Sequence, residues 1–149
     1  MRDTSQKGLI SHTAVLNRLV QLGFEVLLPW ADYLGYDLAY YVTEEHQNFG
    51  FFVHRESYLV RIQVKTAWLS KDGTAIEFNT STVSAGKRGN KKSGYGGKAE
   101  YFGVCSPDTG KVYMVAVAEA AKSNMTLRLE GNAYVYPGTP VKWAKDHEI

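Results

Sequence analysis

Residues 59–65 have the sequence LVRIQVK, in which apolar and polar side chains alternate strictly from Val60 onward. This alternation predicts a β-strand, because successive side chains of a strand point to opposite faces of its sheet. Val60, Ile62 and Val64 then share one face, which suits a buried core. The opposite face carries Arg61, Gln63 and Lys65. We therefore expect Gln63 and Lys65 to project together from one side of a sheet.

Upstream of this strand, residues 9–22 have the periodicity of an amphipathic helix. Positions on one face recur at the i, i+3, i+4 and i+7 spacing of a helix that packs on a core. These positions are His12, Val15, Leu16, Leu19 and Leu22. Gly23 follows the last of them and is a natural helix end.

Strands dominate the rest of the chain. Residues 74–82 are dense in β-branched and aromatic side chains, and residues 107–110 (PDTG) carry a strong turn signal between two apolar runs. We expect the polar residues 43–50 to be a hairpin connection and residues 119–123 to form a short helix. Strands are also expected at residues 24–28, 36–42, 51–65, 101–106, 112–117 and, with turns, 125–136.

One helix followed mostly by strands predicts an α/β or α+β fold, with the helix packed on a sheet. The order argues against a doubly wound nucleotide-binding fold, which needs repeated crossover helices. A chain of 149 residues suits one compact domain, since domains typically contain about 100–200 residues. We therefore expect a single domain over residues 1–149.

The net charge of +2 is small, but its distribution is uneven. Residues 79–98 contain no Asp or Glu, and a glycine-rich loop expected at about residues 83–98 concentrates positive charge. Its basic side chains are Lys87, Arg88, Lys91, Lys92 and Lys98. Such a loop either binds the phosphates of a nucleic acid or is a solvated surface loop.

Cysteine usage and hydropathy exclude several classes of protein. Cys105 is the single cysteine, so the chain has no intramolecular disulfide and no cysteine-based zinc site. The longest apolar run, residues 112–118, is far shorter than the ~20 residues of a membrane helix. The first seven residues lack the apolar core of a signal peptide. We expect a cytoplasmic protein without a membrane partner.

Asp37 stands at the start of a predicted strand that we expect to pair beside the strand of Gln63 and Lys65. Hydrolysis of a phosphodiester needs positive charge against the developing oxyanion and a polarised water. A carboxylate and a backbone carbonyl can hold Mg²⁺, which takes one or two carboxylates and completes its shell with water and phosphate oxygens. Lys65 would orient the water. In the structural alternative, Asp37 caps a turn and Lys65 extends into solvent.

The order of these motifs resembles the PD-(D/E)XK nuclease family. The resemblance extends from about Gly8 to the C-terminus, with an enlarged hairpin at residues 43–56. It is carried by GFEVLLP at 23–29, YDL at 36–38, RIQVKTA at 61–67, YFGV at 101–104, PDTGKVY at 107–113 and KWAKD at 142–146. The sequence is most similar to the small homing endonucleases associated with group I introns, in which Gln replaces the usual acid before the lysine.

This resemblance implies a restriction-endonuclease-like α/β core with a mixed β-sheet and a Mg²⁺ site. It assigns Asp37 as a metal ligand, Gln63 to the position of the second acid and Lys65 as the catalytic lysine. Val64 would offer its backbone carbonyl to the metal.

The first helix departs from the family pattern. Where the family usually carries a Glu, this sequence has His12. Asp37 is then the one assured anionic ligand, and Glu25 is a candidate substitute. His12 is either an active-site residue or a packed core residue.

The function implied by the resemblance is Mg²⁺-dependent cleavage of double-stranded DNA by a homing endonuclease. Cutting two strands with one small site per chain implies a homodimer or homotetramer, because symmetry supplies the second site. Three alternatives stay open. They are a DNA-binding protein with a decayed nuclease site, a restriction or junction-resolving nuclease with the same core, and a β-rich interaction domain.

Three further residues have two interpretations each. Trp68 and Tyr95 either stack on a sugar or base or are packing residues. Glu100 either tethers the basic loop or pairs with Lys98.

Overall fold

A mixed five-stranded sheet forms the centre of the computed structural model, which describes residues 3–48, 50, 52–86, 89–131, 138 and 140–149. The strands are Val26–Leu27 (β1), Leu38–Asn48 (β2), Phe52–Thr66 (β3), Tyr101–Ser106 (β8) and Lys111–Ala116 (β9). Their order is β1-β2-β3-β8-β9. Neighbours are antiparallel except β3 and β8, which are parallel.

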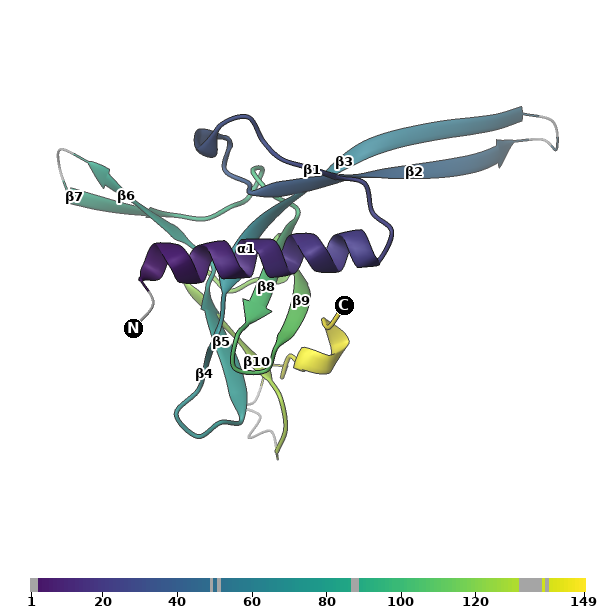
Figure 1. The fold of residues 1–149 in the computed structure, drawn as a ribbon. Coiled ribbons are helices and arrows are strands. Elements are labelled where there is room, and N and C mark those ends of the chain that lie inside the picture. The colour runs from purple at the N-terminus through teal and green to yellow at the C-terminus, as the bar shows by residue number, and fades with distance from the viewer. Residues whose placement is uncertain (1–2, 49, 51, 87–88, 132–137, 139) are drawn as a thin grey trace.

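The helix α1, Thr4–Gln21, lies across one face of this sheet (Figure 1). Val15 and Leu19 are its buried apolar residues and pack in one cluster with Ile62 of β3. Gly103 of β8 lets the helix approach closely, because a Cβ there would lie 2.7 Å from Cγ1 of Val15. The predicted α/β fold, with its N-terminal helix packed on a mixed sheet, is confirmed.

A second, three-stranded sheet packs on the opposite side, in the order β10-β5-β4. Its strands are Trp68–Leu69 (β4), Ala75–Asn79 (β5) and Asn124–Arg128 (β10). Phe78, Phe102 and Tyr113 are fully buried between the two sheets. Within the described residues, three short 3-10 helices lie outside the sheets: Asp32–Leu34 (η1), Val117–Glu119 (η2) and, near the C-terminus, Ala144–Asp146 (η3).

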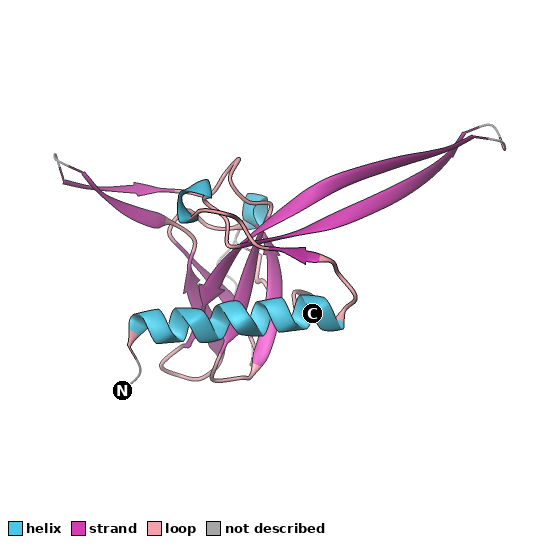
Figure 2. Ribbon diagram, turned by 45° about the horizontal axis from the view of Figure 1, so that its top comes forward, coloured by secondary structure: helices cyan, strands magenta, loops and turns pink. Residues whose placement is uncertain are grey.

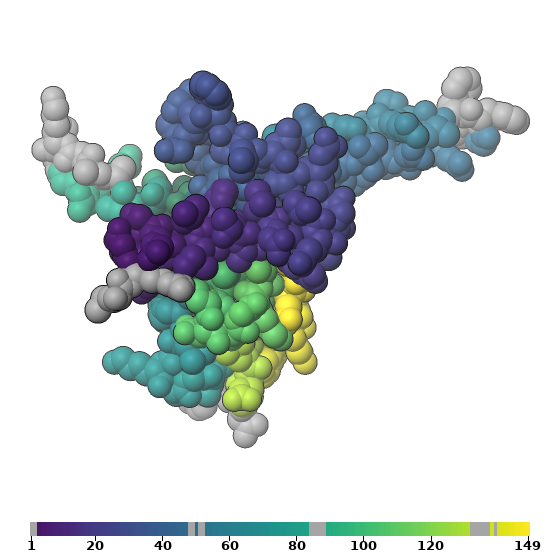
Figure 3. Space-filling model, in the orientation of Figure 1, coloured from purple at the N-terminus to yellow at the C-terminus, as the bar shows by residue number. Residues whose placement is uncertain are grey.

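Two hairpins extend away from this body (Figures 1 and 2). The outer halves of β2 and β3 form the first, which we name the β2–β3 arm. The second, the β6–β7 arm, consists of Thr82–Gly86 (β6) and Gly89–Ser93 (β7). The space-filling view shows both standing clear of the body (Figure 3).

The prediction that residues 43–50 connect two strands is wrong, because β2 continues to Asn48. Polar pairs across the arm replace a core: Arg55 Nε donates to Glu45 Oε1 at 2.6 Å, and the hydroxyls of Thr43 and Ser57 are 3.0 Å apart. These side chains are exposed on both faces of the arm. No apolar alternation therefore marks this half of the strand.

The basic loop and the short helix also differ from their predictions. Residues 83–86 and 89–93 belong to the β6–β7 hairpin, so this part of the predicted loop is strand, whereas residues 94–98 lie outside the strands. The expected helix at 119–123 is absent from this described segment, where η2 ends at Glu119. Residues 87–88 and 132–137 of the predictions lie outside the described residues.

Other boundaries move less. The helix starts at Thr4, five residues before the predicted start, because its first turn is exposed and carries no apolar periodicity. The predicted strands at 24–28 and 74–82 shorten to β1 and β5. The hairpin around residues 107–110 is confirmed as β8 and β9. No helix in the described ranges is long and apolar enough to cross a membrane.

Candidate active site

Asp37 and Gln63 meet at the base of the β2–β3 arm. Asp37 directly precedes β2, and its backbone N–H donates to the carbonyl of Ile62 at 2.8 Å. Nε2 of Gln63 donates to Oδ2 of Asp37, and the backbone N–H of Val64 donates to the same oxygen at 2.7 Å. Of the three side chains that we expected to lie together, Asp37 and Gln63 are therefore in contact.

The Asp37 carboxyl is half-buried, and burial raises its pKa above the ordinary value of 3.8. The N–H of Val64 and the charges of His12 and Lys65 act in the opposite direction without cancelling this effect. Loss of hydration penalises the carboxylate, and a nearby cation offsets that penalty. The position therefore favours a cation at Asp37.

Lys65 projects from the same face of β3 as Gln63 and lies near enough to Asp37 to act on its pKa. Its Nζ donates to the hydroxyl of Tyr95 at 3.0 Å and lies 4.5 Å from the centre of the Tyr95 ring. Asp37, Gln63 and Lys65 thus form one group at the junction of β2 and β3.

α1 contributes His12 to the edge of this group. Nε2 of His12 lies 3.4 Å from the backbone oxygen of Asp37, and the side chain is half-buried. The position that the resemblance singled out therefore adjoins Asp37 and is not enclosed in the core. Glu25 is exposed before β1, and no described contact joins it to Asp37.

The oxygen atoms at this junction fit a divalent cation by their chemistry. Asp37 supplies a carboxylate, Gln63 a side-chain amide oxygen and Val64 a backbone carbonyl, which are hard donors of the kind that Mg²⁺ prefers. In the described parts of the chain, no three His, Cys, Asp or Glu side chains gather in a metal-binding arrangement. A cation here would have one anionic protein ligand and would depend on water and substrate for the rest.

Glu100, whose partner the sequence left open, is bound to Arg61. Its carboxylate accepts the backbone N–H of Arg61 at 2.6 Å and the guanidinium Nη2 at 2.6 Å. Hydrogen bonding to Arg61 lowers the pKa of Glu100 below 4.5. Among the described contacts Glu100 does not pair with Lys98. The alternation places Arg61 on the same face as Gln63 and Lys65, but nothing in the sequence indicated Glu100 as its partner.

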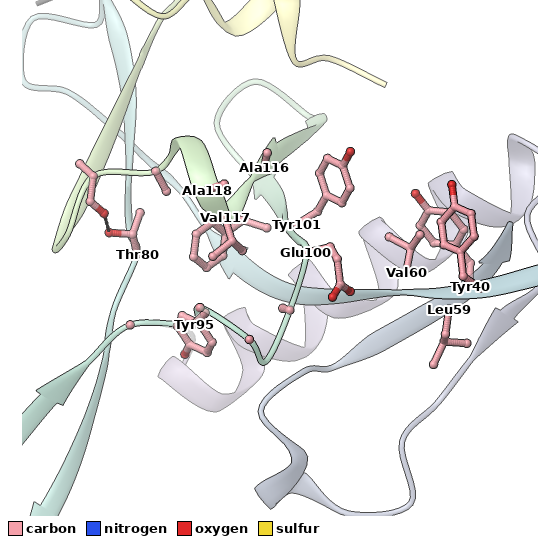
Figure 4. A pocket seen from close by; sticks show the side chains of 18 of the residues that line it. Tyr40, Leu59, Val60, Thr80, Tyr95, Glu100, Tyr101, Ala116, Val117 and Ala118 are labelled. Atoms are coloured by element: carbon pink, nitrogen blue, oxygen red, sulfur yellow. Dashed lines mark hydrogen bonds between the residues drawn. The ribbon is translucent and has the colours of Figure 1, made fainter.

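A groove of about 780 Å³ opens beside the group (Figure 4). Tyr40, Val60, Tyr95, Glu100 and Val117 line part of it. The three grouped side chains lie outside its lining. Tyr95 is the shared wall, since it lines the groove and also contacts Lys65.

The basic residues are distributed around the β6–β7 arm and its base. Lys91 and Lys92 are exposed on β7. Lys98 is exposed nearer the site, where its aliphatic stem covers Gly35, two residues before Asp37. The predicted contacts Lys87 and Arg88 lie outside the described residues.

The two aromatic candidates differ in exposure. Tyr95 is buried, so its ring is not open to a stacking base. Trp68 is 40% exposed, and its Nε1 donates to Glu77 at 3.2 Å.

The mixed sheet, the helix across it and the acid–amide–lysine group at two adjacent strands define a nuclease-like protein. The sequence matches the family model of the PD-(D/E)XK endonucleases over residues 2–149. The chain therefore belongs to the PD-(D/E)XK endonuclease family, as its motif order predicts. Its fold is similar to that of the bacterial homing endonuclease I-Ssp6803I, with a TM-score of 0.68 and 21% identity. That similarity covers 99% of this chain and 89% of the other. No curated protein matches the sequence.

Proposed function

We propose that this endonuclease cleaves double-stranded DNA with Mg²⁺ at the site formed by Asp37, Gln63 and Lys65, and that it acts as a homing endonuclease. The observation that supports the site most directly is the hydrogen-bonded contact between Asp37 and Gln63, with Lys65 on the same face. Membership of the PD-(D/E)XK family supports the reaction, and the fold shared with a homing endonuclease supports the role.

In this proposal Asp37, the amide oxygen of Gln63 and the carbonyl of Val64 hold the cation. When bound, a divalent cation supplies Lewis acidity toward a phosphate oxygen. Lys65 orients the attacking water and places an ammonium charge against the oxyanion that develops on phosphorus. Gln63 is neutral, so Asp37 alone balances the charge of the cation among these side chains.

The β6–β7 arm supplies the DNA contacts in this proposal. A two-stranded β-ribbon fits the major groove of B-DNA. Lys91 and Lys92 occupy successive positions of β7 and so face opposite sides of the ribbon. Positive charge is therefore present on both faces of the ribbon, and Lys87, Arg88 and Lys98 add to the positive charge of this segment of the sequence.

The β2–β3 arm is less suited to phosphates. It carries Glu44, Glu45 and Glu56, and its Arg55 is engaged by Glu45 at 2.6 Å. Like charge repels the DNA backbone. We therefore place the duplex along the β6–β7 arm and not along the β2–β3 arm.

We further propose that the active form is a homodimer or homotetramer, because a two-fold assembly presents one site to each strand. The loop between β1 and β2 exposes apolar side chains that suit such a contact: Leu28 is 64%, Trp30 98% and Tyr33 87% exposed. Light scattering should show a mass above the monomer, reduced by the Trp30→Ser variant.

Cleavage assays test the proposed function. Wild type, Asp37→Ala and Lys65→Ala are incubated with a supercoiled plasmid carrying a pooled random duplex library, so that a rare target is represented. Mg²⁺, Mn²⁺ and Ca²⁺ are compared. We expect cleavage by wild type with Mg²⁺ or Mn²⁺, and loss of cleavage in both variants with DNA affinity within about tenfold of wild type.

Binding without cleavage in any metal would instead indicate a DNA-binding protein with a decayed site, which neutral Gln63 and His12 favour. Absence of salt-sensitive DNA binding would exclude both functions. Inspection of the surrounding gene for an intron tests the homing role separately.

A further inference from the structure

Tyr95 is the buried neighbour of Lys65. It is 7% exposed and stands two residues after the end of β7. Its hydroxyl accepts a hydrogen bond from Nζ of Lys65 at 3.0 Å, and the same Nζ lies 4.5 Å from the ring centre. The ammonium therefore meets both the oxygen lone pair and the electron-rich ring face of a single side chain.

The core and the backbone hold Tyr95 in place. Its ring packs edge-on against Phe102, with centroids 5.5 Å apart and an interplanar angle of 88°. Phe102 is itself 1% exposed. The carbonyl of Tyr95 accepts the backbone N–H groups of Lys98 at 2.9 Å and Ala99 at 3.2 Å. Beyond them, Glu100 is bound to Arg61, on the same strand as Lys65.

Tyr95 is held in place by its surroundings, whereas the ammonium of Lys65 has many accessible positions. A lysine ammonium sits at the end of four rotatable carbon–carbon bonds and can donate three hydrogen bonds. One donated to Tyr95 leaves two for a phosphate oxygen and a water. Packing requires the ring of Tyr95 but not its hydroxyl, and among the described contacts Lys65 is the hydroxyl's hydrogen-bond partner.

We propose that Tyr95 is a positioning residue for Lys65, holding the ammonium over the site by its hydroxyl and ring face. The inference rests on the proposed nuclease function and assigns Tyr95 a role that packing alone does not need. Removing this hydrogen bond should leave the fold and the DNA contacts in place while the ammonium, held by the ring face alone, becomes less precisely positioned.

The test compares Tyr95→Phe with the matched variant Tyr113→Phe. Tyr113 is also buried, at 1% exposure, and its hydroxyl lies 3.3 Å from Thr109 Oγ1, so the control removes a buried tyrosine hydroxyl away from Lys65. We expect Tyr95→Phe to slow single-turnover cleavage by about tenfold to a hundredfold, because a misplacement of about 1 Å can cost up to about a hundredfold in rate. Its DNA Kd and thermal midpoint should match those of the control, whose rate should equal that of wild type.

A double variant separates positioning from a general effect on structure. In the Lys65→Arg background, which keeps a cation and a residual rate for comparison, Tyr95→Phe should cause a much smaller loss of rate than in wild type, because the ammonium that it positions is gone. Equal rates for Tyr95→Phe and wild type would overturn the proposal, and so would independent, multiplicative losses in the double variant.

NMR tests the contact between Lys65 and Tyr95 without a cleavage assay. The Hε–Cε signal of Lys65, assigned by its absence in Lys65→Arg, should lie upfield of the exposed lysines because of the Tyr95 ring. It should return toward them in Tyr95→Leu. An unshifted wild-type signal would overturn the proposal. Failure of the wild-type protein to cleave any DNA would contradict the proposed function instead, while the NMR result would still stand.

Discussion

The carboxylate of Glu100 holds Arg61 by both its main chain and its side chain. Oε2 accepts the backbone N–H at 2.6 Å and Oε1 accepts Nη2 at 2.6 Å, while the N–H of Glu100 donates back to the Arg61 carbonyl at 2.9 Å. The pair joins the loop that carries Tyr95 to the strand that carries Gln63 and Lys65. It therefore fixes the start of β8 against β3.

The first prediction concerns the stability of this pair. Glu100→Gln should lower the free energy of unfolding by about 1 kcal/mol at pH 7, a modest value because both side chains are partly solvated. Because Arg61 lowers the pKa of Glu100 in the folded state, the difference is fully present above pH 4.5 and is lost as the pH falls toward the lower native pKa. Urea unfolding at several pH values measures it.

Glu45→Gln is the control for this prediction. It breaks the more exposed pair with Arg55 on the β2–β3 arm and should have a much smaller effect. Equal losses in the two variants would contradict the special role of the Arg61–Glu100 pair.

The second prediction concerns the cost of a buried carboxylate at Asp37. Its pKa is raised in the folded state, so the folded protein is stabilised less as the pH rises above 3.8. Without metal, Asp37→Asn should therefore unfold at a higher temperature than wild type at pH 8, and the difference should vanish below pH 3.8. Cleavage should fall at least as much as the roughly tenfold to hundredfold typical of an outer-shell partner, because Asp37 is the proposed metal ligand itself.

Calorimetry in EDTA and in Mg²⁺ checks this second prediction. Added Mg²⁺ should stabilise wild type and leave the Asp37→Asn variant unchanged. If the Asp37→Asn variant is less stable than wild type in EDTA at pH 8, the ionised carboxyl stabilises the fold and this prediction is wrong.

The third prediction concerns His12. A carboxylate at this position would add negative charge beside Asp37, and oxygen ligands suit Mg²⁺ better than imidazole does. His12→Glu should therefore lower the Mg²⁺ concentration needed for half-maximal cleavage. Wild type should work relatively better with Mn²⁺. Metal titrations of cleavage measure both effects.

His54→Glu, on the exposed β2–β3 arm, controls for the added charge. If His12 serves packing instead, His12→Glu will leave the metal requirement unchanged and destabilise the fold by about 1–3 kcal/mol. Thermal melts run beside the titrations distinguish the two results.

The fourth prediction concerns the β6–β7 arm. Replacing Lys87, Arg88, Lys91 and Lys92 together by Ala should weaken binding to all duplexes. It should also flatten the dependence of log Kd on log salt by about 0.9 for each phosphate that is no longer neutralised. Lys71→Ala, in the exposed turn after β4, should leave the slope unchanged. An unaltered slope in the fourfold variant would indicate that the arm is a solvated surface element without phosphate contacts.

Half-buried elements could be predicted from the sequence because one face of each is apolar. The alternation around Ile62 correctly placed Gln63 and Lys65 on one side of β3, and the strand start at Asp37 put the acid opposite them. The outer β2–β3 arm was missed because both of its faces meet solvent, so Thr43 and Glu45 carry no periodic signal.

The contacts of Lys65 could not be predicted in the same way. They depend on the path of the loop between β7 and β8, which brings Tyr95 back beneath the sheet. The close approach of α1 to the sheet is another tertiary effect, because it depends on Gly103 facing Val15. Nothing in the sequence indicates that these two residues meet.

Because β3 runs unbroken from the tip of the β2–β3 arm to the site, the arm can lengthen only in steps of two residues if its side chains are to keep their faces. Ten residues of one strand separate Val53 near the tip from Gln63 at the base, roughly 33 Å at about 3.3 Å per residue. Adding two residues to each strand would extend the reach by roughly 7 Å with every side chain on its original face, whereas adding one would invert them all. The span of this arm can thus change in steps of two residues per strand while the far end of the same strand keeps its register.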